Sequence, residues 1–161
     1  MEGEILPLSP LVILRICLYS VFMANIVVID DHPPILKLMA TVCREQGHEV
    51  MAYDNGVAGL EAIRELAPAV ALVDRRLGTM DGLDIVRQVR ELSPTTRCVM
   101  VTGCTETSDI VLAMRRGAYD YITKPFEPDQ LAAAVNEALT GPDDAPPPRQ
   151  KLVIVYPKQA A

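Results

Sequence analysis

The chain has 161 residues, 50% of them hydrophobic, and a formal net charge of -6. This length corresponds to about one domain, with enough apolar residues to build a full core. The acidic balance, without a basic stripe, argues against direct binding of this chain to nucleic acid or to an anionic membrane surface.

The chain begins with an apolar extension, residues 1–23. Its most apolar part, residues 11–22, is interrupted by Arg15 and is shorter than the ~20 residues needed to span a bilayer. The first ten residues contain glutamates but no Lys or Arg, which is the wrong charge for the start of a signal peptide. We therefore expect no membrane span. Two interpretations stay open: Met23 is the true or an alternative start, or the extension is a helix that packs on the domain or on a partner.

Between residues 24 and 140, apolar strand-like runs alternate with segments of helical periodicity. The five runs are 26–29, 49–53, 69–74, 98–101 and 119–123. A helical segment follows each run, and the start or stop signals are Pro33 and Pro34, Asn55, Ser93 and Pro94, Gly117, and Pro128. This alternation is typical of an α/β, flavodoxin-like fold. We expect a doubly wound five-stranded parallel sheet in the order 2-1-3-4-5, with helices on both faces.

Polar residues stand where four of the predicted strands end: Asp30 and Asp31, Asp74, Thr102, and Lys124. In a sheet of this order the three aspartates line one crevice, where their charges repel one another. A divalent cation removes that repulsion, and all-oxygen ligands favour Mg²⁺ over zinc. Such a site suits phosphoryl transfer, in which a carboxylate can itself be the nucleophile. Asp74 is the candidate nucleophile, and Thr102 and Lys124 could bind the new phosphoryl oxygens.

The order and spacing of these motifs resemble the receiver domain of two-component response regulators, in particular receivers of nitrogen-regulation-type activators. The resemblance covers residues 24–140 and rests on five stretches: 27–31 (VVIDD), 72–74 (LVD), 80–82 (MDG), 101–103 (VTG) and 117–126 (GAYDYITKPF). Each stretch alone is a weak signal, whereas all of them in this order are specific.

The resemblance implies that Asp74 is the phosphoacceptor and that Mg²⁺ is held by Asp30, Asp31, Asp74 and the backbone carbonyl of Arg76. Thr102 and Lys124 would contact the phosphoryl group, and Gly103 would leave room for its donor. The Lys124–Pro125 bond is expected to be cis. The protein would phosphorylate and dephosphorylate itself in the presence of Mg²⁺, without any other enzymatic activity.

By the same resemblance, the donor is a sensor histidine kinase or a histidine phosphotransfer protein, and the protein is cytoplasmic. Thr102 and Tyr121 would form the switch that reports phosphorylation. The output face would consist of the last strand and the helices over residues 107–116 and 128–140. A homodimer could form through this face. Asp81 and Asp84 are expected at a helix start, where acids interact favourably with the helix dipole, without a chemical role.

One position departs from the family pattern. The family usually has proline four residues after the acceptor, where this chain has Gly78 followed by Thr79. Two flexible residues should loosen the loop beside the site and change phosphorylation or dephosphorylation rates, without removing a reacting group. The positions that tune acyl-phosphate lifetime in the family are here Arg76 and Cys104.

Residues 141–161 comprise a Pro-rich linker and, over 151–157, a short strand-like tail. No output domain fits there, so the expected function is that of a stand-alone receiver acting through protein contacts. Two alternatives stay open. One is an interaction module that works without phosphorylation, and the other is a metal-dependent phosphohydrolase.

The cysteines suggest neither a metal site nor a disulfide. They include no CxxC pair and have no histidine cluster near them: Cys17, Cys43, Cys98 and Cys104. We interpret them as reduced, mostly buried thiols.

Overall fold

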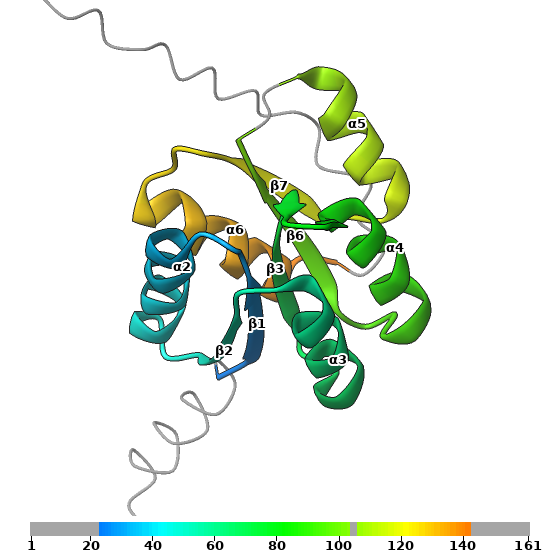
Figure 1. The fold of residues 1–161 in the computed structure, drawn as a ribbon. Helices are drawn as coiled ribbons and strands as arrows, with labels where there is room; N and C mark the ends of the chain where they lie inside the picture. Colours follow the sequence, from blue (N-terminus) through cyan, green and yellow to red (C-terminus); the bar gives the residue numbers. More distant parts are fainter. Residues whose placement is uncertain (1–22, 104–105, 143–161) are drawn as a thin grey trace, which may run out of the picture.

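The computed structural model describes residues 23–103 and 106–142 (Figure 1). The predictions for the extension before residue 23, for the tail after residue 142, and for Cys17 and Cys104 lie outside these residues. The elements in chain order are β1 (Asn25–Ile29), α2 (Pro33–Glu45), β2 (Glu49–Tyr53), α3 (Gly56–Leu66), β3 (Val70–Asp74), β4 (Arg76–Leu77), β5 (Met80–Asp81), α4 (Gly82–Leu92), β6 (Arg97–Thr102), α5 (Thr107–Arg116), β7 (Asp120–Thr123) and α6 (Pro128–Thr140).

Five of the strands form one parallel sheet in the order β2-β1-β3-β6-β7. Because β4 and β5 pair separately, this is the order 2-1-3-4-5 for the five predicted strands, and the flavodoxin-like fold is confirmed. From β1, the chain adds β2 on one side and then β3 and the later strands on the other side. The carboxyl ends of β1 and β3 therefore border the crevice that such sheets use for binding.

The sheet is covered on both faces (Figure 1). Helices α2 and α6 pack against one face, where the core includes Ile26, Val28, Leu72, Val99 and Val101. Helices α3, α4 and α5 pack against the other, where it includes Val27, Ile29, Val73, Cys98 and Met100. Neighbouring residues of one strand thus enter opposite cores. All five residues of β3 are buried, as the uninterrupted apolar run ending at Asp74 predicted.

The predicted helix signals act as expected. Pro33 and Pro34 occupy the first turn of α2, and the Asn55 side chain accepts a hydrogen bond from the Ala58 N–H at 2.9 Å. Gly117, with φ of 106°, ends α5 in the left-handed region. The Lys124–Pro125 peptide bond is cis. Within 23–103 and 106–142, no helix is both long enough and apolar enough to cross a membrane.

The short antiparallel hairpin of β4 and β5 was not predicted. It pairs Arg76 with Asp81 and Leu77 with Met80, so Gly78 and Thr79 form its two-residue loop. Gly78 and Thr79, which depart from the family pattern, thus lie in a hairpin loop directly beside the carboxyl end of β3, and their effect on phosphorylation rates stays a prediction.

Candidate functional site

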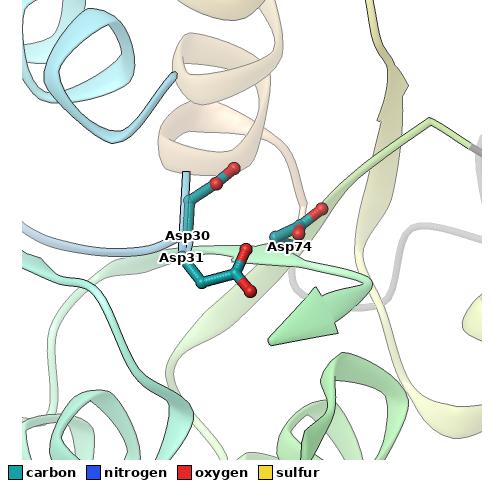
Figure 2. A group of neighbouring side chains, drawn as sticks. All are labelled: Asp30, Asp31 and Asp74. Carbon is teal, nitrogen blue, oxygen red and sulfur yellow. The ribbon is translucent and has the colours of Figure 1, made fainter. Parts of the chain in front are cut away.

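Three aspartates meet at the carboxyl ends of β1 and β3 (Figure 2). Asp30 follows β1 and is 0% exposed, while Asp74 is the last residue of β3 and is 6% exposed. Asp31 is exposed to solvent. One carboxylate oxygen from each of the three lies within 4.8 Å of the others. The sheet order therefore brings Asp74 close to two carboxylates that lie more than forty residues earlier in the chain.

Lys124 joins two of these carboxylates. Its Nζ donates to Asp30 Oδ2 at 2.7 Å and to Asp74 Oδ1 at 3.0 Å. Burial raises the pKa of Asp74, and the nearby Asp30 charge adds to this, although Lys124 opposes both. For Lys124 itself, burial lowers the pKa, but the hydrogen bonds and charges of the two aspartates outweigh burial and raise it. The ammonium therefore stays protonated and balances one of two buried negative charges.

A cavity of about 260 Å³ opens beside Asp74. Its lining residues lie at or just after the carboxyl ends of β3, β6 and β7, and one of them, Arg76, begins β4: Asp74, Arg75, Arg76, Thr102, Gly103 and Lys124. Thr102 is 6% exposed and ends β6, the neighbour of β3 in the sheet. A Cβ built on Gly103 would meet no other atom within 4 Å, so this wall of the cavity is open. The candidate nucleophile thus faces a space bordered by a hydroxyl and an ammonium group.

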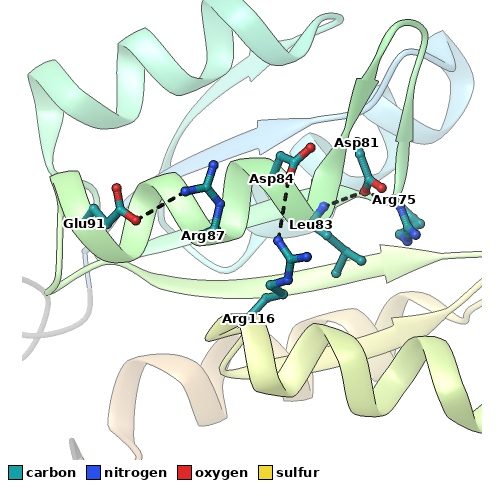
Figure 3. Close-up of polar contacts among 7 residues, drawn as sticks. All are labelled: Arg75, Asp81, Leu83, Asp84, Arg87, Glu91 and Arg116. Carbon is teal, nitrogen blue, oxygen red and sulfur yellow. Dashed lines mark hydrogen bonds and ion pairs between the residues drawn. The ribbon is translucent and has the colours of Figure 1, made fainter.

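The segment after Asp74 is held in place by several contacts (Figure 3). Arg75 forms an ion pair with Asp81, and the Asp81 carboxylate also accepts the Leu83 N–H at 2.8 Å at the start of α4. A Cβ on Gly82 would collide with the backbone carbonyl of Asp74. Only glycine at position 82 lets α4 begin so close to the end of β3.

Asp84 has a structural role, as predicted. It lies in the first turn of α4 and forms an ion pair with Arg116 of α5 at 3.6 Å. Another pair on the same helix, Arg87 with Glu91, spans 3.4 Å (Figure 3). Both pairs are 40 to 65% exposed and so contribute little to stability. The Asp84–Arg116 pair joins α4 to α5, and the Arg87–Glu91 pair lies within α4.

A receiver-domain family model, described as the response regulator receiver domain, matches residues 26–136. The chain belongs to the response regulator receiver family. It is 38% identical over 122 residues to the DNA-binding response regulator MtrA of Mycolicibacterium smegmatis, covering 76% of this chain and 53% of that protein. It is 32% identical over 115 residues to the regulatory protein AtoC of Escherichia coli, covering 71% of this chain and 25% of that protein.

Solved structures agree with this assignment. A CheY-like receiver domain protein of Methanospirillum hungatei superimposes with a TM-score of 0.69 at 29% identity, covering 73% of this chain and 94% of that one. NtrX of Brucella abortus, solved with ATP, gives 0.68 at 35% identity, covering 72% and 27%. The chain spans about half the length of the MtrA proteins it matches.

The acidic crevice of this receiver fits a magnesium ion by its donor chemistry. Receiver domains use Mg²⁺ at an acidic pocket, and this site offers carboxylate oxygens from three residues. Lys124 is hydrogen-bonded to Asp30 and Asp74, and a bound cation would reduce the remaining repulsion among the carboxylates. Asp30, Asp31 and Asp74 are therefore suited to hold a hydrated divalent cation.

The fourth predicted metal-binding group is the backbone carbonyl of Arg76, a residue that lines the cavity with Asp74. The Gly82 N–H donates to the Arg75 carbonyl at 3.0 Å, which makes these two residues a hydrogen-bonded pair. Pairs alternate along an antiparallel ladder, so the next pair, Arg76 with Asp81, directs its carbonyls away from the partner strand. The structure thus brings all four predicted metal-binding residues to one edge of the sheet.

Tyr121, the predicted switch aromatic, does not line the cavity. It lies in β7 opposite Met100 and is partly buried against the core shared with α3, α4 and α5. Burial raises the pKa of its hydroxyl, with a further contribution from the Asp120 charge. Tyr121 is therefore connected to the site through the β6–β7 pairing that ends at Thr102 and Thr123, rather than by direct contact.

One contact at the site was missed from the sequence. The Gly78 N–H donates to Asp31 Oδ2 at 3.0 Å, across 47 residues of chain. A Gly-Thr pair between hydrophobic residues is a weak hairpin signal, but strands of two residues carry no period by which to recognise them. The importance of Gly78 therefore lies in a long-range hydrogen bond that no local pattern shows.

Proposed function

We propose that this receiver accepts a phosphoryl group on Asp74, from a histidine kinase or a histidine phosphotransfer protein, in a reaction that requires Mg²⁺. The observation that carries the proposal is the position of Asp74. Its carboxylate borders the cavity and is hydrogen-bonded by Lys124, and it lies with Asp30 and Asp31 in one acidic cluster.

The chemistry follows from this arrangement. A carboxylate oxygen of Asp74 attacks the phosphorus, and the new O–P bond forms as the P–N bond of the phosphohistidine breaks. The electron pair of that bond stays on the histidine nitrogen, which then takes up a proton. Lys124, already beside Asp74, neutralises charge on the transferred group, and Thr102 donates a hydrogen bond to it. Mg²⁺, when bound, supplies charge neutralisation and alignment of the phosphoryl oxygens.

The acyl phosphate would be lost by attack of water on the same phosphorus, which regenerates the carboxylate. We propose no other enzymatic activity for the chain. Arg76 borders the cavity beside Asp74 and is exposed, so it is placed to influence the approach of donor and water.

The signal would leave through the face made of α5, β7 and α6. Helix α5 exposes Val111 and Leu112, with 39% and 36% of their surface accessible, and large exposed apolar side chains favour protein contacts. Thr102 and Tyr121 lie on neighbouring strands beneath this face. A homodimer through α5 and α6 stays a prediction.

The length of the relatives bears on the output. The curated MtrA relatives are named as DNA-binding regulators, and this chain covers about half of each. A stand-alone role, without direct nucleic-acid binding, therefore stays a prediction from the sequence. The kinase donor and the output partner are proposals of the same kind.

Intact mass after incubation with acetyl phosphate and Mg²⁺ tests the proposal. We expect the wild type to gain one phosphoryl group, and we expect no gain in EDTA or in Asp74→Asn. Asp129→Asn, which removes a carboxylate from the first turn of α6, is the matched control and should be phosphorylated normally. No gain from acetyl phosphate or from a phosphorylated kinase would instead support an interaction module. Repeated turnover of p-nitrophenyl phosphate would support a phosphohydrolase.

A further inference from the structure

Asp31 differs from the other two acidic residues of the site. Asp30 and Asp74 are buried and receive hydrogen bonds from Lys124, whereas Asp31 is exposed. An exposed carboxylate rotates among several side-chain conformations unless something holds it. The hydrogen bond from the Gly78 N–H to Asp31 Oδ2, at 3.0 Å, supplies that restraint.

The donor is available because of the turn that presents it. Leu77 and Met80 pair across the hairpin, so Gly78 is the first residue of a two-residue loop. The φ of Gly78 is +60°, while the φ of Thr79 is not positive. This combination matches a type II′ turn, which has glycine first. In such a hairpin the N–H of the first loop residue lies outside the ladder, and here it points to Asp31.

We propose that Gly78 is a positioning residue for Mg²⁺ binding: its backbone N–H holds the Asp31 carboxylate in the orientation in which the other oxygen can bind the ion. The inference rests on the proposed function, since it assumes a Mg²⁺ site at the three aspartates. One hydrogen bond to Oδ2 leaves the remaining lone pairs of the carboxylate for the ion and its waters. Residues that orient metal ligands typically change affinity by about 10- to 100-fold.

The position also explains why glycine is suited to this site. Proline, the usual residue of the family here, has no N–H and cannot adopt a φ of +60°. A Cβ at position 78 would meet nothing within 4 Å, so alanine keeps the donor and adds no collision, although the positive φ strains its backbone. Gly78→Pro therefore removes the donor and the positive φ together, whereas Gly78→Ala keeps the donor. Asp31→Ala removes the acceptor and leaves the residues of the turn unchanged.

Two measurements test the inference. The first is the dissociation constant for Mg²⁺ by isothermal titration calorimetry, for the wild type, Gly78→Pro and Gly78→Ala. The second is hydrogen exchange of the Gly78 amide by NMR in the metal-free protein, compared with Asp31→Ala. Thermal unfolding in EDTA shows that each variant is folded. We expect Gly78→Pro to weaken Mg²⁺ binding about tenfold, toward the lower end of the range because Asp31 is exposed. We expect a smaller change in Gly78→Ala, and faster exchange of the Gly78 amide in Asp31→Ala.

The outcomes separate the inference from the proposed function. A wild type that binds no Mg²⁺ would overturn the proposed function and the role of Gly78 with it. If the wild type binds Mg²⁺ and Gly78→Pro binds it equally well, only the positioning role fails. Equal losses in Gly78→Pro and Gly78→Ala would assign the effect to backbone strain and overturn the role of the donor. Unchanged exchange in Asp31→Ala would show that Asp31 does not accept this hydrogen bond, which also overturns the inference.

Discussion

Replacing Lys124 with methionine should destabilise the metal-free receiver by about 3 kcal/mol, the lower end of the range for breaking a buried ion pair. The ammonium is hydrogen-bonded to Asp30 and Asp74, whose side chains are 0% and 9% exposed. Two charges 4.8 Å apart repel by about 3.5 kcal/mol at an effective dielectric constant of ~20. Without Lys124, this repulsion and the burial of both carboxylates are no longer balanced. The lower end applies because 20% of the Lys124 side chain is exposed, which admits water.

Thermal unfolding followed by circular dichroism in EDTA at pH 7 measures this loss. For a domain of this size, 3 kcal/mol corresponds to a fall in Tm of roughly 10 to 15 °C. Lys37→Met, on the exposed surface of α2, is the matched control and should change Tm little. Mg²⁺ should restore much of the stability of Lys124→Met, and so should Asp74→Asn in the same chain. A loss below 1 kcal/mol would refute the reasoning, because solvent rather than Lys124 would then balance the carboxylates.

Two further predictions concern Asp74 and the residue packed on it. Asp74→Asn should stabilise the metal-free protein at pH 7, because burial raises the pKa of Asp74 and makes its ionised form unfavourable in the folded state. Since the folded state binds this proton more tightly than the unfolded state, wild-type stability should fall as pH rises from the ordinary value of 3.8 through the raised pKa. Urea unfolding between pH 4 and 8 should show a flatter profile for Asp74→Asn, and an identical profile would contradict the assignment. Gly82→Ala should cost about 1 to 3 kcal/mol and slow phosphorylation, since its Cβ would collide with the Asp74 carbonyl. Gly103→Ala, with nothing within 4 Å of its Cβ, is the control for stability alone, and equal losses of stability in both variants would argue against this packing.

The main features of the fold follow from local patterns. Apolar runs without alternation indicate strands buried on both faces, and the five residues of β3 are indeed all buried. The Asn55 cap and the Gly117 stop act through neighbouring backbone, so they can be read directly from the sequence. The strand order was inferred from the alternation and the family resemblance, and the structure confirms it.

The hairpin of β4 and β5 shows the limit of such patterns. Its strands have two residues each, too few to display a period, and its loop was interpreted as flexible because it contains glycine. The positive φ of Gly78 is used here for a tight turn, a role that the sequence interpretation did not include.

The sequence by itself determined which residues end the strands, since that follows from apolar periodicity and from turn residues close in the chain. Only the tertiary structure decided how those residues share charge and hydrogen bonds. Lys124 reaches Asp30 across 94 residues, and Gly78 reaches Asp31 across 47. Which carboxylate is buried, which is exposed and which partner balances each depends on how β1, β3 and β7 are arranged in the sheet. The physical reason is that burial and electrostatic interaction depend on distance in space, which a one-dimensional pattern does not contain.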